Sequence, residues 1–312
     1  DYNASYIAII ENKVDGYYRN NMWPIKVGNK NIKAFFGEIF VDPLHRNTRY
    51  PIFTRLLSAG YQEIARQKGL IYGFPTARSV VHHHKRYHTT ILKKIPRYEL
   101  LLNFRHVLKR TLQAKSPGLI IKYMIQQILG LYRLPIVLLK KRNMAVREIQ
   151  SFDERFDVLW EKASPYYPIL SVRNRTYLQW RYVMEPGQTY TCLVVEKNNQ
   201  ILAYAILKKE TKENRPVGVI VDLFGIPTTA IFFCLLQAVV DYFLMKKVDK
   251  IECYMSNPPC EKILRGFGFL TKIYESKRSD RLLTRSYSPE VKNELILNPD
   301  DWFITDTDML LS

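Results

Sequence analysis

Acidic residues are scarce in the first half of this 312-residue chain. Residues 1–150 contain 26 Lys and Arg but 8 Asp and Glu, whereas residues 151–312 contain 21 of each kind, so the formal net charge of +18 comes from the first half. Between residues 78 and 147 there are 16 basic residues and one acid, Glu99. A positive field of this kind attracts nucleic acid, anionic lipid or a polyanionic substrate, and does not distinguish among them.

Cysteine is also rare, and all four cysteines lie in the second half: Cys192, Cys234, Cys253 and Cys260. None belongs to a CxxC pair or lies at metal-ligand spacing from a histidine, so the sequence lacks the usual zinc and redox motifs. We expect reduced, buried thiols in a cytoplasmic protein.

Long apolar runs are missing as well. The most hydrophobic stretch, residues 119–139, is interrupted by Lys122, Gln126, Gln127, Arg133 and Pro135. A spanning helix needs about 20 nearly uninterrupted apolar residues, so we reject a membrane span here. An apolar run at residues 6–10 stands close to Asp1, so we also expect that a piece of the protein is missing upstream.

Glycine is absent from the turn that carries the most information. An apolar strand pattern ends at Val41, a basic turn runs through His45 to Arg49, and an amphipathic helix starts near Pro51. A strand, a tight turn and a helix N-terminus direct backbone N–H groups and the positive end of the helix dipole at one point, which suits a pyrophosphate. Asn47 tolerates the left-handed backbone that glycine usually supplies, and the Arg49 guanidinium can hold a phosphate bidentately.

The second half has the pattern of a complete α/β unit. Two strands joined by Asn198-Asn199 predict a hairpin, and an alternation of strands and helices continues to a Gly-Phe element at residues 266–269. We expect strands at 145–149, 190–196, 201–208, 217–224, 250–255 and from 269, and helices at 152–163, 176–183, 228–246 and 259–265.

The first half repeats this order without its beginning. A hairpin around Asn12-Lys13 precedes a long strand at 32–41, a helix at 51–68, a strand at 70–74 and a short helix at 77–87. Self-similarity of this length indicates two copies of one fold. The first copy then lacks an opening strand and two helices.

A basic insertion, residues 100–144, separates the two copies. Its helical stretch sets the apolar residues Ile120, Ile121, Met124, Ile125 and Ile128 beside lysines and arginines. A basic amphipathic helix is a candidate for an anionic membrane surface. It is equally compatible with a linker helix that packs on both copies.

This order of elements resembles the GNAT superfamily, which transfers acyl groups from acyl-coenzyme A. The residues that carry the resemblance are 41–46 leading into 52–56, then Gly73-Phe74-Pro75, and Leu264 to Phe269. The resemblance implies an α/β (α+β) fold made of two tandem GNAT-like domains with mixed central sheets. We therefore predict a first domain at residues 1–99, truncated at its start, the insertion at 100–144, and a second domain at 145–312.

The resemblance also implies the site. Acetyl-coenzyme A or another acyl-coenzyme A is the expected co-substrate, with no metal, and its binding residues are predicted to be Phe40, Val41, Arg46, Asn47, Thr48, Arg49, Tyr50 and Ile52. The equivalent turn of the second copy, residues 225–229, has no basic residue, so coenzyme is expected in the first copy. Glu38, on the strand that enters the turn, is the predicted general base. The alternative is a strand glutamate paired with a nearby Lys or Arg.

A narrower resemblance is to tandem GNAT proteins that tailor bacterial cell-surface polysaccharides and lipids. It is carried by residues 173–182 and by the tail at 302–306. It implies transfer to an amine or hydroxyl of a small molecule or cell-surface precursor, by a cytoplasmic protein at the inner face of a membrane. The alternative for the Trp180-Arg181 cluster is core packing, with an arginine paired to a tail acid such as Asp306 or Asp308.

Other readings stay open. His84 and His88 have zinc spacing on a helix, but no HExxH acid or third ligand accompanies them, so a solvated basic helix is favoured over a metal site. Fem-type transferases also pair two GNAT-like domains and use aminoacyl-tRNA, which suits the basic first half. The third reading is an inactive GNAT-like scaffold.

Overall fold

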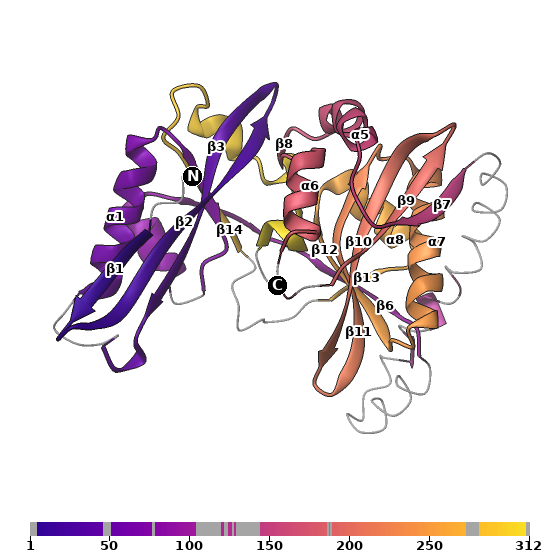
Figure 1. Cartoon of the computed structure of the whole chain (residues 1–312), viewed down its shortest axis with the longest axis horizontal. Coiled ribbons are helices and arrows are strands. Elements are labelled where there is room, and N and C mark those ends of the chain that lie inside the picture. The colour runs from indigo at the N-terminus through magenta and orange to yellow at the C-terminus, as the bar shows by residue number, and fades with distance from the viewer. Residues whose placement is uncertain are drawn as a thin grey trace. The chain divides into compact units, whose positions relative to one another are not determined.

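The computed structural model describes residues 5–45, 51–76, 79–103, 120–121, 124–126, 128, 144–185, 187, 189–272 and 281–309 (Figure 1). These residues form mixed α/β structure that divides into two compact units. Unit 1 comprises Asp1–Lys94, Pro168–Val172 and Glu275–Trp302, and unit 2 comprises Ile95–Tyr167, Arg173–Tyr274 and Phe303–Ser312.

A mixed sheet forms the centre of unit 1. Its strand order is β5-β14-β4-β3-β2-β8, and β1 pairs with β2. Only the β3–β4 pair is parallel among the described strands of this sheet. The strands are β1 (Ser5–Ile10), β2 (Lys13–Val27), β3 (Lys30–Val41), β4 (Leu70–Gly73), β5 (Thr90–Lys94), β8 (Ile169–Ser171) and β14 (Arg281–Ser286).

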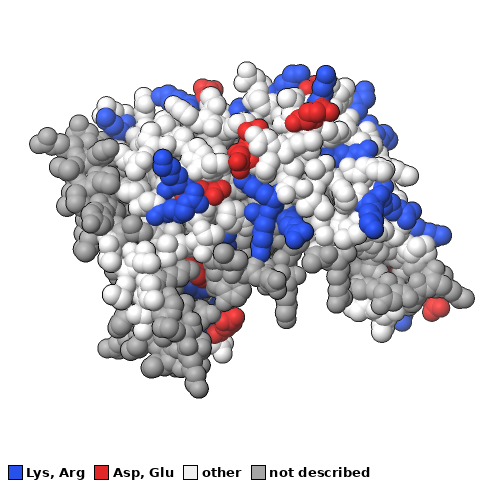
Figure 2. All heavy atoms as spheres, turned by 180° about the vertical axis from the view of Figure 1, so that it is seen from behind, with Lys and Arg blue, Asp and Glu red and all other residues white. Residues whose placement is uncertain are grey.

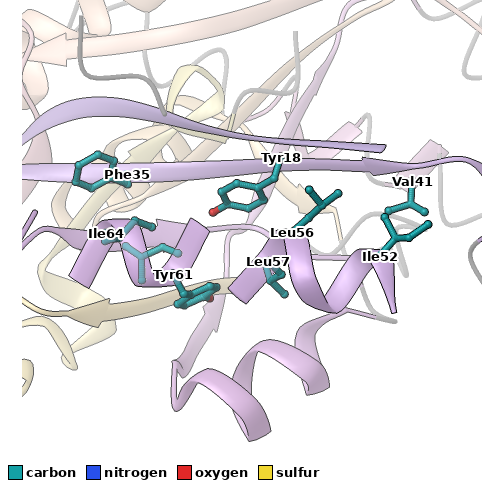
Figure 3. Packing of buried hydrophobic residues seen from close by; sticks show 9 residues of the cluster. Tyr18, Phe35, Val41, Ile52, Leu56, Leu57, Tyr61 and Ile64 are labelled. Atoms are coloured by element: carbon teal, nitrogen blue, oxygen red, sulfur yellow. The ribbon is translucent and has the colours of Figure 1, made fainter. Parts of the chain in front are cut away.

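Helix α1 (Ile52–Arg66) covers one face of β1, β2 and β3. Its apolar side chains recur at helical spacing, so one stripe of the helix packs against the sheet. Figure 3 shows Tyr18 and Phe35 of the strands against this stripe. The buried cluster consists of Tyr18, Phe35, Val41, Ile52, Leu56, Leu57, Tyr61, Ile64 and Ile71. The short helix α2 (Val80–Tyr87) follows β4 in the chain.

Unit 2 has its own mixed sheet, in the order β13-β6-β12-β11-β10-β9-β7. The β11–β12 pair is parallel, as β3–β4 is in unit 1. The strands are β6 (Arg97–Leu101), β7 (Ala145–Ile149), β9 (Thr191–Lys197), β10 (Gln200–Lys212), β11 (Arg215–Gly225), β12 (Lys250–Ser256) and β13 (Leu270–Lys272). Strand β15 (Trp302–Thr305) pairs with the end of β12.

Capping residues fix the ends of two helices of unit 2. Asn257 caps α8 (Pro258–Phe267) through its side chain, and Gly268 ends it in the left-handed conformation with φ 113°. Asn174 caps α6 (Arg175–Tyr182) in the same way. Helix α5 (Arg155–Ala163) contacts β10 and β11, and α7 (Thr229–Met245) contacts β9 and β10.

Each sheet contains strands from distant parts of the chain, and β8, which pairs with β2 in unit 1, is one of them. In unit 1, β14 lies between β4 and β5, although its residues come from the end of the sequence. In unit 2, β6 lies between β12 and β13, although its residues come from the first third. The predicted boundaries at 99/100 and 144/145 do not anticipate this exchange, because they cut the chain into consecutive pieces.

Most of the sequence-based elements agree with the structure to within a few residues, although β2 extends to Val27, well beyond the short hairpin expected around Asn12-Lys13. The first hairpin turns at Glu11-Asn12 rather than at Asn12-Lys13, with φ 49° and 61°, and the second turns at Asn198-Asn199, with φ 50° and 62°. Two positive φ values match the two-residue turns that suit the twist of a hairpin. The structure adds strands β5, β6, β8, β14 and β15, which the sequence analysis does not predict.

Most of the predicted insertion at 100–144 lies outside the described residues. In its described part, Ile121, Met124, Ile125 and Ile128 are exposed. Gln126 is buried, accepts a hydrogen bond from the Leu101 backbone N–H at 3.1 Å and donates one to the carbonyl of Glu99 at 2.7 Å.

No helix among the described residues has the length and apolarity needed to cross a membrane. The face in Figure 2 shows Lys and Arg side chains in several separate groups, with Asp and Glu among some of them. On this face the described basic residues do not form one continuous patch.

The contact of α1 with Tyr18 can be tested at a glycine. A Cβ atom at Gly60 would lie 2.0 Å from Tyr18 Cε1, so we expect Gly60→Ala to lower the free energy of unfolding by about 1–3 kcal/mol through overpacking. The matched control is Gly266→Ala in α8, where the nearest atom is 3.7 Å away and alanine should raise helix stability by up to about 1 kcal/mol. Urea unfolding of both variants measures the difference, and equal behaviour would contradict the expected contact.

Candidate functional site

The two parallel strands of unit 1 separate soon after they begin to pair. Their register contains Ala34 opposite Leu70 and Phe35 opposite Ile71. Strand β3 continues to Val41 along β2, whereas β4 continues along β14. The facing backbone edges beyond Phe35 and Ile71 therefore open away from each other.

A cavity of about 210 Å³ lies where these strands separate. Both strands, α1, α2 and β14 contribute to its walls, so the cavity belongs to unit 1. Most of the lining is apolar or aromatic, and a few polar groups are included, which is the usual composition of a small-molecule site. Its lining residues are Tyr18, Phe36, Gly37, Ile39, Leu57, Tyr61, Ile71, Tyr72, Gly73, Phe74, Pro75, Thr76, Ser79, His83 and Leu283.

Two hydrogen-bonded pairs place polar groups at this cavity. The Tyr61 hydroxyl and His83 Nδ1 are 2.8 Å apart, and the Tyr18 hydroxyl donates to Asn20 Oδ1 at 2.7 Å. Burial, and then the neighbouring His82, lower the pKa of His83 to about 4, while burial raises the pKa of Tyr61 well above its usual value. At neutral pH the imidazole is therefore uncharged and the Tyr61 phenol keeps its proton. We had not singled out either tyrosine from the sequence.

The N-terminus of α1 follows β3 closely in the chain. Pro51 precedes the helix, and its first turn contains no acidic residue. The first-turn N–H groups of a helix have no partner within the helix, so this end can receive an anion. Residues 46–50 lie outside the described residues, so the placement of Arg46, Asn47, Thr48, Arg49 and Tyr50 is not described.

The described members of the predicted coenzyme set lie in two environments. Val41 and Ile52 are buried in the cluster under α1, so their side chains belong to the core. Phe40 lies on the opposite face of the sheet, is 46% exposed and stacks on Tyr17 with ring centroids 5.9 Å apart. Neither Val41 nor Ile52 is among the residues that line the cavity.

Glu38 shares the face of Phe40. It is partly buried, lies opposite Arg19 in the β2–β3 register, and stands between Gly37 and Ile39, which both line the cavity. Its own side chain is not among the lining groups. Phe36, two residues before Glu38 and on the same face of β3, does line the cavity, so the predicted base stands beside it.

Two of the three consecutive histidines at 82–84, His83 and His84, have hydrogen-bond partners, whereas the buried His82 Nε2 has none among the described residues. His84 Nδ1 lies 2.7 Å from the Thr89 carbonyl, and His83 pairs with Tyr61 as described above. Within the described part of the chain, no three His, Cys, Asp or Glu side chains are arranged to hold a metal ion. All four cysteines are free and buried.

In unit 2 the corresponding opening is filled by the chain itself. Strands β11 and β12 pair up to Ile220 opposite Cys253 and then separate. Strand β15 pairs with β12 at this end, with Met255 opposite Thr305. The short helix η5 (Asp306–Met309) then contacts both β11 and β12.

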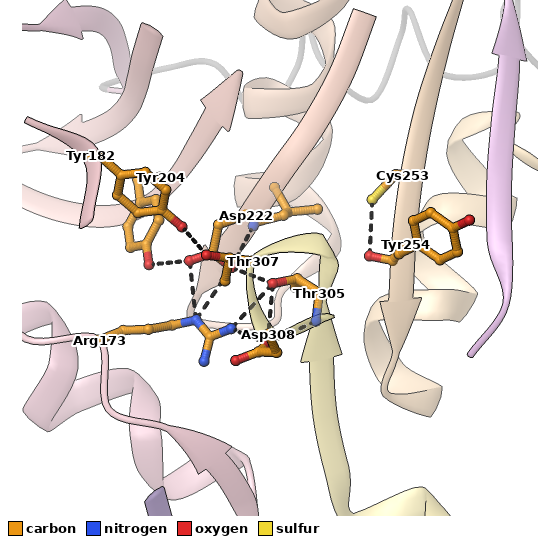
Figure 4. A network of polar contacts seen from close by, with 10 residues as sticks. Arg173, Tyr182, Tyr204, Asp222, Cys253, Tyr254, Thr305, Thr307 and Asp308 are labelled. Atoms are coloured by element: carbon orange, nitrogen blue, oxygen red, sulfur yellow. Dashed lines mark hydrogen bonds and ion pairs between the residues drawn. The ribbon is translucent and has the colours of Figure 1, made fainter. Parts of the chain in front are cut away.

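A buried ionic network fixes this segment (Figure 4). Arg173 Nε lies 3.1 Å from Asp222 Oδ2 of β11, and Arg173 Nη2 lies 2.6 Å from Asp308 Oδ2 of η5. The Thr305 hydroxyl donates to Asp222 Oδ1 at 2.8 Å, and the Tyr204 hydroxyl donates to Asp222 Oδ2 at 2.7 Å. The two carboxylates raise the pKa of Arg173 although burial opposes them, so the guanidinium stays charged.

The expected pairing of the Trp180-Arg181 cluster needs a correction. Arg181 forms an ion pair with Glu185 one helical turn away, and Trp180 is 48% exposed. The arginine that binds the tail acid is Arg173, just before α6. The reason is geometric: the extended segment before α6 reaches Asp308, whereas the side chain of Arg181 lies along its own helix.

Removal of Arg173 tests how strongly this network holds the tail. Arg173→Met leaves Asp222 and Asp308 buried without their cation, and we expect the free energy of unfolding to fall by about 3–5 kcal/mol. Arg265→Met is the matched control, because Arg265 is half exposed, pairs with Glu261 at 3.3 Å and should contribute at most about 1 kcal/mol. Chemical denaturation of the two variants gives the comparison. A loss for Arg173→Met no larger than that of the control would contradict the assigned role.

Comparisons with known proteins identify the fold of the chain through solved structures of low sequence identity. No family model matches the sequence, and no curated protein matches it. Among solved structures, a conserved protein of unknown function from Enterococcus faecalis V583, described as a probable N-acyltransferase, has a TM-score of 0.62 at 10% identity. A GCN5-related N-acetyltransferase from Anabaena variabilis ATCC 29413 has a TM-score of 0.61 at 11% identity, and Eis1 from Mycobacterium abscessus has 0.51 at 14%.

These similarities extend over almost the whole chain. They cover 92%, 91% and 91% of it, but 62%, 63% and 64% of the respective neighbours, so the chain spans less than two thirds of their length. At such low identity the similarity shows the fold alone. The chain has the mixed α/β fold of the GNAT N-acetyltransferases.

Proposed function

We propose that the chain is an acyl-coenzyme A-dependent acyltransferase whose coenzyme binds in the cleft of unit 1. The observation that carries the proposal is the open cavity between β3 and β4, beside the helix that begins after the basic turn. In unit 2, Thr305 and η5 occupy the opening between the corresponding strands. One coenzyme per chain is the expected stoichiometry.

The strand registers of the two units match, which supports the proposal that both units derive from one GNAT-like domain. Each of the two hairpins turns on two residues with positive φ. A residue of the unit 1 hairpin corresponds to the residue 187 positions later in the unit 2 hairpin, as Asn12 corresponds to Asn199. Tyr17 opposite Phe40 then corresponds to Tyr204 opposite Phe224. The segments 1–99, 100–144 and 145–312 remain our proposed domains and insertion, with β6 and β14 exchanged between the two sheets.

The proposed coenzyme position follows the shape of the cleft. The thioester end lies in the cavity between β3 and β4, and the pyrophosphate lies at the N-terminus of α1. Side chains of Arg46, Asn47, Thr48, Arg49 and Tyr50 and backbone atoms near Phe40, Val41 and Ile52 are the proposed contacts. Helix N-termini and arginines are both suited to phosphate groups.

The proposed reaction is direct attack of an amine or hydroxyl on the thioester carbonyl carbon. Glu38 accepts the proton of the nucleophile, a new C–N or C–O bond forms, and the C–S bond breaks. The departing thiolate takes a proton from water, and the protonated Tyr61 hydroxyl at the cavity is the proposed hydrogen-bond donor that stabilises it. The acceptor we propose is a cell-surface precursor at the cytoplasmic face of a membrane.

Coenzyme binding is the first test. We expect calorimetric titration with acetyl-coenzyme A to give about one site per chain, and a ligand at about 100 times its dissociation constant to add about 2.7 kcal/mol of apparent stability. Gly73→Leu should abolish binding without unfolding, because a Cβ there meets its nearest atom at 3.9 Å and the rest of the side chain fills the cavity. Arg46→Ala with Arg49→Ala should weaken binding.

The same titration separates the alternatives. If neither the native chain nor the variants give a heat signal, acetyl-coenzyme A is excluded as the cofactor and an inactive scaffold is favoured. Salt-sensitive binding of aminoacyl-tRNA without competition by coenzyme A would favour a Fem-like transferase.

The role of Glu38 is tested by kinetics. We expect Glu38→Gln to lower kcat by about 10²- to 10⁴-fold, because a general base in the transition state contributes that much, while coenzyme binding stays unchanged. Thiol release from acetyl-coenzyme A with amine-bearing sugar nucleotides measures the rate. Glu294→Gln, at an exposed position, is the control. Full activity of Glu38→Gln would remove it from the mechanism.

A further inference from the structure

The cavity of unit 1 is larger than an acetyl group requires. Its volume is about 210 Å³. An apolar cavity of about 150 Å³ holds one benzene molecule, so by proportion this cavity holds about eight non-hydrogen atoms. The reactive end of an acetyl thioester has the sulfur, the carbonyl carbon and oxygen, and the methyl carbon. Space for about four further atoms therefore remains.

The walls of this cavity suit an apolar group. Ile71, Tyr72 and Leu283 line it and are each at most 3% exposed. The Phe36 ring lies 6.0 Å from the Tyr72 ring and 6.4 Å from the Phe74 ring. Among the described lining residues there is no Asp, Glu, Lys or Arg. An aliphatic chain gains free energy by burial against such walls, whereas a carboxylate loses its hydration without meeting a cation among these residues.

The Tyr18 ring forms a wall that is held in place. A Cβ atom at Gly37 or at Gly60 would clash with the Tyr18 side chain, so the ring lies closely between two glycines. The Tyr18 hydroxyl donates to Asn20 Oδ1 at 2.7 Å, and Asn20 Nδ2 donates to the Gly60 carbonyl at 3.2 Å. These contacts fix the size of the cavity on the side of α1.

The width of the cavity between the two strands depends on Phe36 of β3 and Gly73 of β4. A Cβ atom at Gly73 would lie 3.9 Å from Phe36 Cε2, in ordinary contact, so the two residues face each other across the opening. Both are partly exposed, in contrast to the buried walls. A methyl group on Gly73 narrows the cavity, and a smaller side chain at position 36 widens it.

We propose that the acyl group carried by the coenzyme is an uncharged aliphatic chain of about four to six carbon atoms, and that Phe36 and Gly73 set its length. The larger number applies if the chain and the thioester fill the cavity. The smaller number applies if two methylene groups of the coenzyme arm also lie inside. The proposal rests on the proposed function, because it places the thioester end of the coenzyme in this cavity.

The affinities of a series of coenzyme A thioesters test the chain length without an acceptor. Calorimetry compares free coenzyme A with its acetyl, butyryl, hexanoyl, decanoyl and succinyl thioesters. We expect binding to tighten up to about fourfold for each added methylene as far as hexanoyl, because burial of one methylene is worth about that factor. No further gain is expected from hexanoyl to decanoyl. Succinyl-coenzyme A should bind at least about tenfold more weakly than butyryl-coenzyme A, because its carboxylate would be buried.

Two substitutions in the cavity should move this preference in opposite directions. We expect Gly73→Ala to weaken hexanoyl binding at least about fourfold relative to acetyl, because the added methyl takes the space of one methylene. Phe36→Leu should let decanoyl bind at least about fourfold more tightly than hexanoyl. Gly266→Ala and Tyr166→Leu, both in unit 2, are the controls and should leave the order of affinities unchanged. Melting curves confirm that each variant folds.

The outcomes separate this proposal from the proposed function. If neither free coenzyme A nor any thioester binds, both fall. If coenzyme A binds but the acetyl, butyryl and hexanoyl thioesters bind equally well, the coenzyme site stands and the longer acyl group is overturned. An affinity that keeps rising to decanoyl in the native chain, or succinyl binding as tight as butyryl binding, would also overturn it.

Discussion

The separation of two parallel strands is the constraint on which both units depend. Backbone N–H and C=O groups are obligatory hydrogen-bonding groups, so a pair of strands that parts must offer its freed edges to something else. In unit 2 the chain offers its own residues, and Thr305 pairs with Met255. In unit 1 a cavity remains between the strands. The same strand arrangement therefore has two outcomes: the opening is filled by the chain in unit 2 and remains a cavity in unit 1.

The filled opening has its own energetic logic. A buried charge is costly unless it is paired and hydrogen-bonded, and Arg173 meets that condition through Asp222 and Asp308. We infer that the main effect of the network is specificity. An apolar tail of this length has no fixed register on its own, whereas the planar guanidinium group favours one arrangement of the two carboxylates.

Local signals were read correctly from the sequence because their causes are local. The Asn198-Asn199 turn acts through φ preferences within a few residues. The strands β6 and β14 were missed because their partners lie far away in the sequence, and nothing in a five-residue apolar pattern names a distant neighbour. At the site, the basic turn and Glu38 were visible as residue types in order, whereas Tyr61 and His83 meet only through the packing of α1 against α2.

The exchanged strands have a consequence for synthesis of the protein. Strand β14 lies between β4 and β5, yet Arg281 is made long after Lys94, so the unit 1 sheet stays split while the intervening residues are translated. At about 5–20 residues per second this interval is on the order of ten seconds or more. During that time the edges of β4 and β5 resemble exposed edge strands, which are templates for aggregation. The sheet of unit 1 can therefore be completed only after residues 281–286 have been synthesised.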